Sequence, residues 1–346
     1  MGHLSHVWAF AAVAGIAAIA AGPVRADAVA DFYQGKTVTI VVSSASGGTY
    51  DAHARLLSRH LSRHLPGNPQ VVVQNMPGAG GMVAANHLYN VAAKDGSIVG
   101  GIQANVPFEP FYGNGQAQFD AKKFNWLGSP TRETRLFILA GRVPVDTIEQ
   151  ARQRELVMGA TGVNSTPALY ARIFGAVFNL KIKLIAGYTS QTEALLALER
   201  GENDGFPSPT LTSLMVSHPD WLAKKFLKIL FQYGTEPHPD LKGVPWAPEI
   251  APDAESRSII EIASASQTVS RPLLMPPGVP ADRLAAVRQA IQATYRDADY
   301  KAECDKLKLE CEGPSDGAEV AKLIDKTYAT PEAVRQRMIT IYGSGG

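Results

Sequence analysis

Residues 37–65 place a strand, a loop of small residues and the start of a helix in one short run. Residues 38–42 are β-branched, which is typical of a buried strand. The loop at residues 43–49 holds only small or hydroxyl-bearing residues, and apolar residues then recur at helical spacing from Tyr50. Such a run leaves backbone N–H groups and the positive end of the helix dipole facing one point. It therefore predicts an anion site, and we expect it to hold a carboxylate.

Asp51 stands in the first turn of that helix, where an acidic residue complements the helix dipole. Its charge would repel an anionic ligand. We therefore expect a structural role, in which the carboxylate pins the loop or a neighbouring N–H group.

Two kinds of enzyme chemistry fit the sequence less well. The glycines at residues 78–81 suggest a dinucleotide loop, but residues 75–77 separate them from the preceding strand, and no acidic residue ends the next strand. No nucleotide cofactor is therefore expected. A serine hydrolase is disfavoured because no G-x-S-x-G motif occurs, so the loop serines are interpreted as hydrogen-bond donors.

Three histidines, His53, His60 and His64, share one stripe of the predicted helix. Leu61 stands where a zinc protease of the H-E-x-x-H type has its glutamate. The spacing favours a solvated helix face, and we expect no metal site.

The chain has 346 residues, of which 45% are hydrophobic and 19% charged, so one large or two medium globular domains are expected. Residues 1–26 hold one of the 33 basic residues and none of the 32 acidic ones, which leaves 32 of each in the remainder. A neutral chain argues against nucleic-acid or anionic-membrane binding, because both need a basic surface. Selectivity for an anion would have to come from a local site.

The first 26 residues have the features of a secretory signal peptide. Residues 7–21 are apolar, and Val24 and Ala26 are small residues at the −3 and −1 positions of a cleavage site. A membrane anchor and a disordered leader are the alternatives, although the apolar run is shorter than the about 20 residues that a membrane span needs. We expect a protein exported to the periplasm.

Cys304 and Cys311 are the only cysteines. On one continuous helix they would lie about 10 Å apart, too far for a disulfide. However, residues 302–307 resemble a helix end and residues 307–311 a short strand, so the chain could fold back between them. A disulfide and two buried free thiols both stay open as interpretations.

Strands and helices alternate along most of the chain, which indicates mostly parallel, doubly wound sheets. Two similar α/β units with polar loops at their strand ends imply a cleft between two lobes. Residues 108–130 form a loop-rich margin between the units. The predicted strands are residues 37–42, 70–74, 97–103, 136–140, 155–160, 183–186, 228–232 and 267–275, and the predicted helices include residues 82–92, 145–154, 168–178, 191–200 and 281–295.

Two motifs in these loops resemble those of the TctC or Bug family, the periplasmic solute-binding proteins of tripartite tricarboxylate transporters. Residues 44–48 (SASGG), followed by Asp51 and by Ala54-Arg55, resemble the family pattern PF-x-PGG-x-x-D-x-x-AR. Residues 71–81 (VVVQNMPGAGG) resemble V-V-V-x-N-x-PGAGG almost letter for letter. The resemblance covers roughly residues 31–340.

The resemblance implies a type II periplasmic-binding-protein fold, in which two doubly wound α/β lobes are joined by two crossing strands around a ligand cleft. The crossings would lie near residues 132–139 and 269–275. Residues 1–26 would be the signal peptide, residues 27–131 and 270–346 the two parts of the first lobe, and residues 132–269 the second lobe.

The resemblance also implies a function without catalysis or cofactor. The chain, a monomer, would capture a small organic acid and deliver it to the membrane permease subunits of a tripartite transporter. A receptor that presents its ligand to a sensor kinase is the alternative, and an exported hydrolase is less favoured.

In this family the first loop, the PGAGG loop and small polar residues of the second lobe hold the ligand carboxylate. The residues expected to bind it here are Ser44, Ser46, Gly47, Gly48, Thr49, Ala79, Gly80, Asn105, Asn164, Ser165, Thr166, Tyr188 and Ser208. The sequence departs from the family at Ser43-Ser44 and Ser46, where prolines and a phenylalanine are usual.

Arg132, Arg135 and Arg271 lie on or beside the predicted crossings. A guanidinium there could pair with a second ligand carboxylate. Salt bridges between the lobes are the favoured interpretation.

Overall fold

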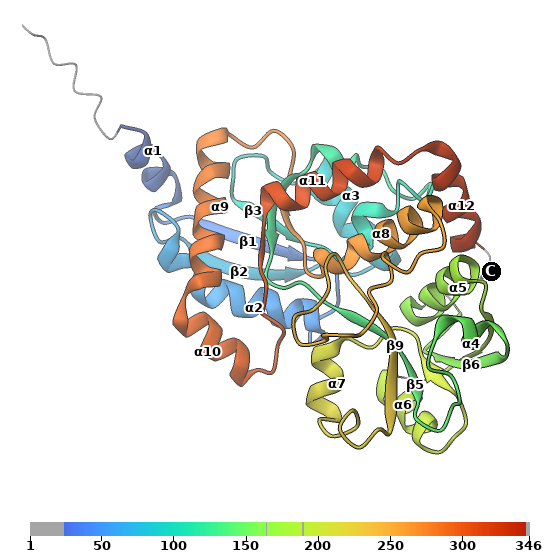
Figure 1. The fold of residues 1–346 in the computed structure, drawn as a ribbon. Helices are drawn as coiled ribbons and strands as arrows, with labels where there is room; N and C mark the ends of the chain where they lie inside the picture. The colour runs from blue at the N-terminus through green and yellow to red at the C-terminus, as the bar shows by residue number, and fades with distance from the viewer. Residues whose placement is uncertain (1–23, 164, 189, 344–346) are drawn as a thin grey trace, which may run out of the picture.

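The computed structural model describes residues 24–163, 165–188 and 190–343, and its strands form two sheets (Figure 1). The first sheet has the order β11-β4-β10-β3-β1-β2 and the second the order β7-β6-β8-β5-β9. In β1 (Thr37–Val42), Val38 and Ile40 belong to one core cluster and Val41 to another, so this strand is buried on both faces. The expected fold, two lobes each built from a sheet and its helices, is confirmed.

In the first sheet β1, β2 (Gln70–Asn75) and β3 (Ile98–Gly101) run parallel, and Val42 pairs with both Asn75 and Gly101. Their carboxyl ends therefore lie at one edge. The antiparallel strand β10 (Leu273–Met275) lies between β3 and β4 (Asn125–Ser129), and β11 (Ser315–Asp316) completes the sheet. The associated helices are α1 (Val24–Tyr33), α2 (Thr49–Leu61), α3 (Met82–Asn90), α9 (Ala281–Arg296), α10 (Ala298–Lys306) and α11 (Gly317–Tyr328), with 3-10 turns at Ser62–His64, Ala79–Gly81, Val106–Phe108 and Ala121–Lys123.

In the second sheet β6 (Glu155–Ala160) is parallel to β7 (Lys181–Ala186) and to β8 (Gly205–Phe206), whereas β5 (Arg135–Ala140) is antiparallel to its neighbours β8 and β9 (Leu227–Tyr233). The ends of β6 and β7 coincide, since Ala160 pairs with Ala186. The helices here are α4 (Ile148–Arg152), α5 (Thr166–Phe178), α6 (Gln191–Glu199) and α7 (Leu211–Ser217).

The chain passes between the sheets twice, from β4 to β5 and back before β10. Two helices lie against elements of both lobes. The helix α8 (Ala254–Thr268) packs on α5 of the second lobe and α11 of the first (Figure 1). The helix α12 (Glu332–Gly343) packs on α5 and α8, and its Arg335 donates to the carbonyl oxygen of Phe111 in the first lobe at 2.8 Å.

Three local predictions are wrong. Residues 267–268 end α8 instead of beginning a strand, because the buried face of that helix (Ile259, Ile260 and Ala263) continues its helical pattern toward Gln267. The loop-rich margin at residues 108–130 contains β4, whose Trp126 and Leu127 are buried. Residues 307–311 form no strand, because the chain turns after α10.

Cys304 and Cys311 form a disulfide, with their Cα atoms 6.5 Å apart. The disulfide interpretation is therefore confirmed, and the end of α10 at Lys306 supplies the reversal it required. Most of the predicted signal peptide, residues 1–23, lies outside the described residues. Among the residues that are described, no helix has the length and apolar character needed to cross a bilayer.

Candidate functional site

The loops that follow β1, β2 and β3 meet at the carboxyl edge of the first sheet. The N–H of Gln103, after β3, donates to Ser43 Oγ, after β1, at 2.9 Å. Gly81, after β2, has φ +100°, and a Cβ there would lie 2.8 Å from Val106 Cγ2 and 3.3 Å from Ser43 Oγ. The predicted loops therefore lie together at this edge of the sheet, and the close contact between them requires a glycine at position 81.

Asp51 organises the first loop, as predicted. Its Oδ2 accepts from the N–H of Gly47 and from Arg55 Nε, both at 2.9 Å, and its Oδ1 accepts from Asn75 Nδ2 at 2.9 Å. Asn75 also donates to the carbonyl oxygen of Ser44 at 3.0 Å. The hydrogen bond from Arg55, together with those from Gly47 and Asn75, lowers the pKa of Asp51 to about 2.

This arrangement refines the predicted anion site. Because Asp51 accepts the N–H of Gly47, that donor is already used within the protein. Gly48 precedes α2 in extended conformation, and no side chain caps the helix start. Ser46, Gly48 and Thr49 are exposed. What this loop offers an anion is therefore the uncapped first turn of α2 with the neighbouring hydroxyls.

The second loop carries exposed Ala79 and Gly80, with φ values of +44° and +63°. The space around the Cα of Gly80 is open, since a Cβ there would meet nothing within 4 Å. Asn105, after β3, is exposed, but its Nδ2 donates to Glu109 Oε1 at 2.9 Å. The amide oxygen and the second N–H of Asn105 are left for a ligand or a water.

In the second lobe the predicted residues follow β6, β7 and β8. Ser165 Oγ donates to the carbonyl oxygen of Gly162 at 2.7 Å, which shapes the turn before α5, and Thr166 is exposed at the start of that helix. Asn164 lies outside the described residues. Tyr188 lies half-buried against the core of this lobe, and Ser208 is buried with its carbonyl oxygen accepting from Arg135 at 2.7 Å.

A buried charge cluster joins the two lobes at the crossings. Glu133 pairs with Arg135 at 2.9 Å and with Arg271 at 3.1 Å, and the Arg271 guanidinium lies 4.7 Å from the centre of the Tyr50 ring. Tyr50 Oη in turn accepts from the N–H of Ala104. Burial alone would raise the pKa of Glu133, but Arg135 and then Arg271 outweigh it and leave that pKa below its ordinary value.

The favoured interpretation of the crossing arginines, salt bridging, is confirmed, since Arg132 also pairs with Glu319 at 2.8 Å. The partners of these arginines were not predicted. They include Glu133, and Gln267, whose side chain accepts a hydrogen bond from Arg135. The sequence signal that could have predicted the role of Glu133 was its position between Arg132 and Arg135 at the first crossing.

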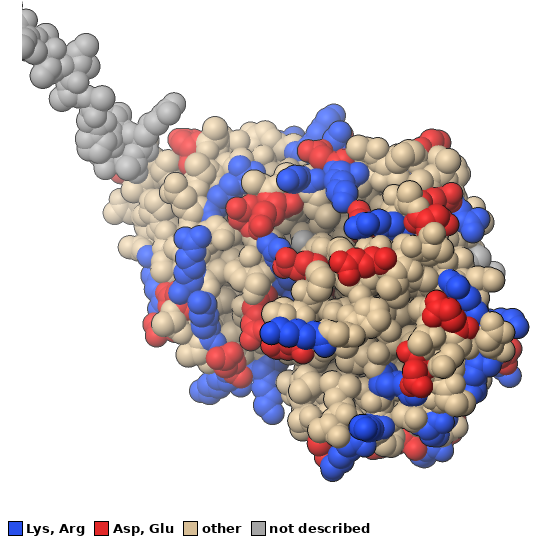
Figure 2. All heavy atoms as spheres, viewed as in Figure 1, with Lys and Arg blue, Asp and Glu red and all other residues tan. Residues whose placement is uncertain are grey.

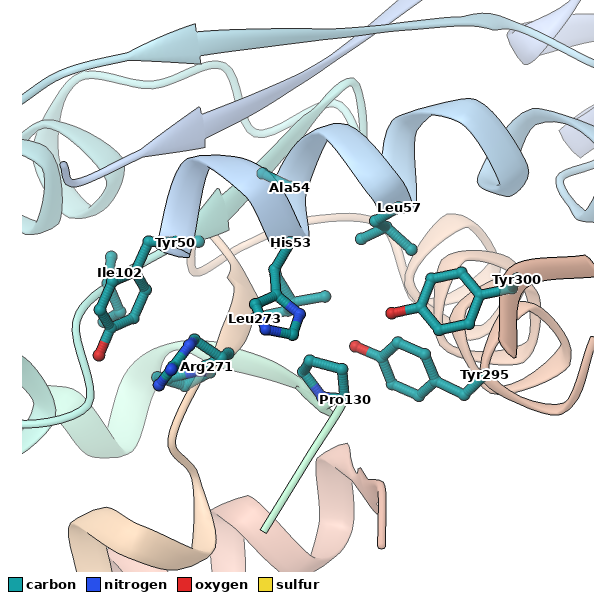
Figure 3. Close-up of a pocket in the computed structure, with 12 residues that line it drawn as sticks. Tyr50, His53, Ala54, Leu57, Ile102, Pro130, Arg271, Leu273, Tyr295 and Tyr300 are labelled. Carbon is teal, nitrogen blue, oxygen red and sulfur yellow. The ribbon is translucent and has the colours of Figure 1, made fainter. Parts of the chain in front are cut away.

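His53 and His60 are buried, so the predicted solvated face of α2 is wrong for both. His60 meets Glu303 of α10 at 2.5 Å. His53 borders a cavity of about 20 Å³ and points toward Arg271, Pro130 and the Tyr295 hydroxyl (Figure 3). Neither of its ring nitrogens has a hydrogen-bond partner among the described residues. Burial, followed by the charge of Arg271, lowers the pKa of His53 to about 3.

Replacing His53 with leucine is expected to make the protein more resistant to acid. The folded state disfavours protonated His53, so stability should be lost as the pH falls below 6.5, by up to about 1.4 kcal/mol per unit. Between pH 6.5 and 5 the free energy of unfolding should fall by about 2 kcal/mol less in His53→Leu than in the wild type. Urea denaturation of both proteins at several pH values across this range measures the difference. Parallel curves for His53→Leu and wild type would show that folded His53 takes up the proton freely.

No protein-family model matches the chain. A crystal structure of a TctC solute-binding protein from Polaromonas, without ligand, superposes with a TM-score of 0.71 at 18% identity, covering 89% of this chain and 99% of that one. The chain has the fold of TctC-type solute-binding proteins. MatC from Rhodopseudomonas palustris with bound malate has a TM-score of 0.55 at 20% identity, covering 89% of this chain and 99% of MatC. An R. palustris protein with adipate has a TM-score of 0.57 at 20% identity, covering 88% and 97%.

One curated relative shares a short stretch with this chain. It is the UPF0065 protein in the TAR-I ttuE-ttuC′ intergenic region of Agrobacterium vitis, 45% identical over 65 residues. The stretch is 19% of this chain and 17% of the relative, so the match spans about a sixth of the relative's length. The resemblance expected from the loop motifs is confirmed by these findings.

Proposed function

We propose that the chain is an extracytoplasmic solute-binding protein that captures a small carboxylate-bearing metabolite and delivers it to a tripartite tricarboxylate-type membrane transporter. The observation that carries this proposal is the meeting of the Ser43, Gly81 and Gln103 loops at one sheet edge, next to the uncapped start of α2. An uncapped helix start is a carboxylate site that needs no basic side chain.

In this proposal the proximal carboxylate lies against the first turn of α2 and the Gly80 loop. The hydroxyls of Ser44 and Thr49 donate to its oxygens, while Asp51 stays bound to the loop. Ser46, whose hydroxyl donates to Asp51 Oδ2 at 3.4 Å here, turns to the ligand when it binds. The second lobe closes on the ligand with Ser165, Thr166 and neighbouring residues. Support comes from two R. palustris proteins that share the fold. MatC holds malate and the second protein holds adipate, and both ligands are dicarboxylates.

The proposal includes the two-part first lobe, residues 27–131 and 270–346, and the second lobe, residues 132–269. It also includes periplasmic action, a monomeric state and binding without turnover. On the face shown in Figure 2, acidic and basic side chains are interspersed. A surface of mixed sign would leave anion selection to the local site.

A thermal-shift screen of the chain from residue 27 onward against small organic acids tests the proposal. A ligand present at about 100 times its Kd adds about 2.7 kcal/mol of stability, which gives a clear rise in Tm. Deleting the gene should then abolish cellular uptake of the organic acid that raised the Tm. If uptake persists and only the induction of a transport operon is lost, the chain serves a sensor kinase instead.

A further inference from the structure

Two carboxyl groups, those of Glu133 and Glu310, meet at the junction of the lobes. Glu133 belongs to the segment from β4 to β5, and Glu310 to the loop between α10 and β11. Both side chains border the same groove and lie within hydrogen-bond reach of each other. Because a carboxylate only accepts hydrogen bonds, one of the two groups must carry a proton. The contact therefore holds one proton.

The surrounding bonds place that proton on Glu310. Both oxygens of Glu133 face guanidiniums: Oε1 forms an ion pair with Arg271 at 3.1 Å, and Oε2 accepts a hydrogen bond from Arg135 at 2.9 Å, so Glu133 is the ionised partner. Among the described residues no base forms an ion pair with Glu310, whose Oε1 accepts from Thr210 Oγ1 at 3.1 Å. Burial, followed by the charge of Glu133, raises the pKa of Glu310 to about 7.

Glu310 connects parts of the chain that belong to different lobes. Thr210 caps α7 of the second sheet's lobe, accepting from the N–H of Ser213 at 3.1 Å. The loop of Glu310 is also bound by the N–H of Arg132, which donates to the carbonyl oxygen of Glu312 at 3.2 Å. The adjacent disulfide fixes this loop to α10. The position of Glu310 is thus held from one lobe while its side chain contacts the other.

The contact borders a groove of about 1010 Å³, through which solvent reaches it. The other charged groups on the groove are Lys301, Asp305 and Lys308 on or just after α10, Glu312 in the loop, and Glu236 and His238 opposite. His238 is half-buried and the other groups are exposed, so water and salt screen the effect of their charges on the pKa of Glu310. Arg132, also on the groove, is already paired with Glu319.

We propose that the Glu133–Glu310 contact is a proton-dependent bridge that restrains the two lobes in the arrangement seen here and loosens as the medium becomes more alkaline. The inference rests on the hinge geometry and holds whichever solute is bound. In the folded protein Glu310 keeps its proton until the pH approaches 7, whereas a solvated glutamate has an ordinary pKa of 4.5, so the contribution of the bridge to stability is complete below pH 4.5. Its contribution falls as the pH rises to about 7 and then stays constant.

The test compares the wild type with Glu310→Gln, which keeps the hydrogen bond to Glu133 without a titrating proton, in the absence of ligand. The equilibrium constant for wild-type unfolding should rise by up to tenfold per pH unit between pH 4.5 and 7 relative to Glu310→Gln, so the two Tm values should diverge over this range. Glu312→Gln, a neighbouring exposed residue that contributes only its backbone, should follow the wild type. At pH 8, amide hydrogen exchange in residues 130–134 should be faster in the wild type than in Glu310→Gln, and at pH 5 the two should agree.

Parallel Tm profiles for wild type and Glu310→Gln would overturn the proposal, as would equal exchange at pH 8. Infrared spectroscopy of wild-type protein with isotope-labelled glutamate gives an answer even if Glu310→Gln fails to fold. The carbonyl band of a protonated carboxyl should persist at pH 6 and vanish by pH 8. Its absence at pH 6 would likewise overturn the proposal.

Discussion

Glu133→Ala is expected to destabilise the protein by about 3–5 kcal/mol, because it leaves two buried guanidiniums without their shared carboxylate. Only 3% of the Glu133 side chain is exposed, against 19% for Arg135 and 15% for Arg271. Removing one partner of a buried ion pair costs more than the pair contributes, since the remaining charges stay desolvated. Urea denaturation at pH 7 measures the loss.

A matched control is the exposed pair formed by Arg200 and Glu202. Glu202→Ala should leave the urea midpoint close to that of the wild type, because water screens that pair. Equal losses of stability for Glu133→Ala and Glu202→Ala would mean that water reaches the buried charge cluster. The cluster would then not hold the lobes together.

Gly80→Val is expected to weaken ligand binding by tenfold or more while the protein still folds. At φ +63° a β-branched residue is strained, so the loop should change its backbone conformation. No atom lies within 4 Å of the added Cβ, so the change should stay local. Titration calorimetry measures the affinity, and a melting curve checks the fold.

Gly35→Val is the control for this substitution. Gly35 has φ +69°, its Cβ would also meet nothing within 4 Å, and it precedes β1, at the opposite edge of the sheet from the loops. The Gly35→Val variant should have similar backbone strain and should bind the ligand with wild-type affinity. If both variants bind like the wild type, the Gly80 loop does not contact the ligand.

Local patterns predicted the fold well because they depend on neighbouring residues. The β-branched run of β1 predicted its burial, and the apolar spacing at residues 145–154 and 168–178 predicted the helices observed as α4 and α5. The role of Asp51 also followed from local spacing, since Gly47 and Arg55 lie four residues to either side.

The burial of the α2 histidines could not be predicted in the same way. The burial of His60 depends on Glu303, which is 243 residues further along the chain. The burial of His53 depends on Tyr295 and Arg271, which α9 and the return crossing bring to it. Polar residues on a helix stripe predict exposure unless another element covers them, and one sequence does not contain that information.

The central claim is that this TctC-type fold binds a small organic acid and leaves it unchanged. Titration calorimetry of the chain from residue 27 onward, with malate, adipate and matched monocarboxylates, tests it most directly. We expect saturable one-site binding of at least one such acid, and recovery of the same molecule after prolonged incubation. If no organic acid binds, or the recovered molecule is chemically altered and Ser46→Ala prevents the change, the account is contradicted.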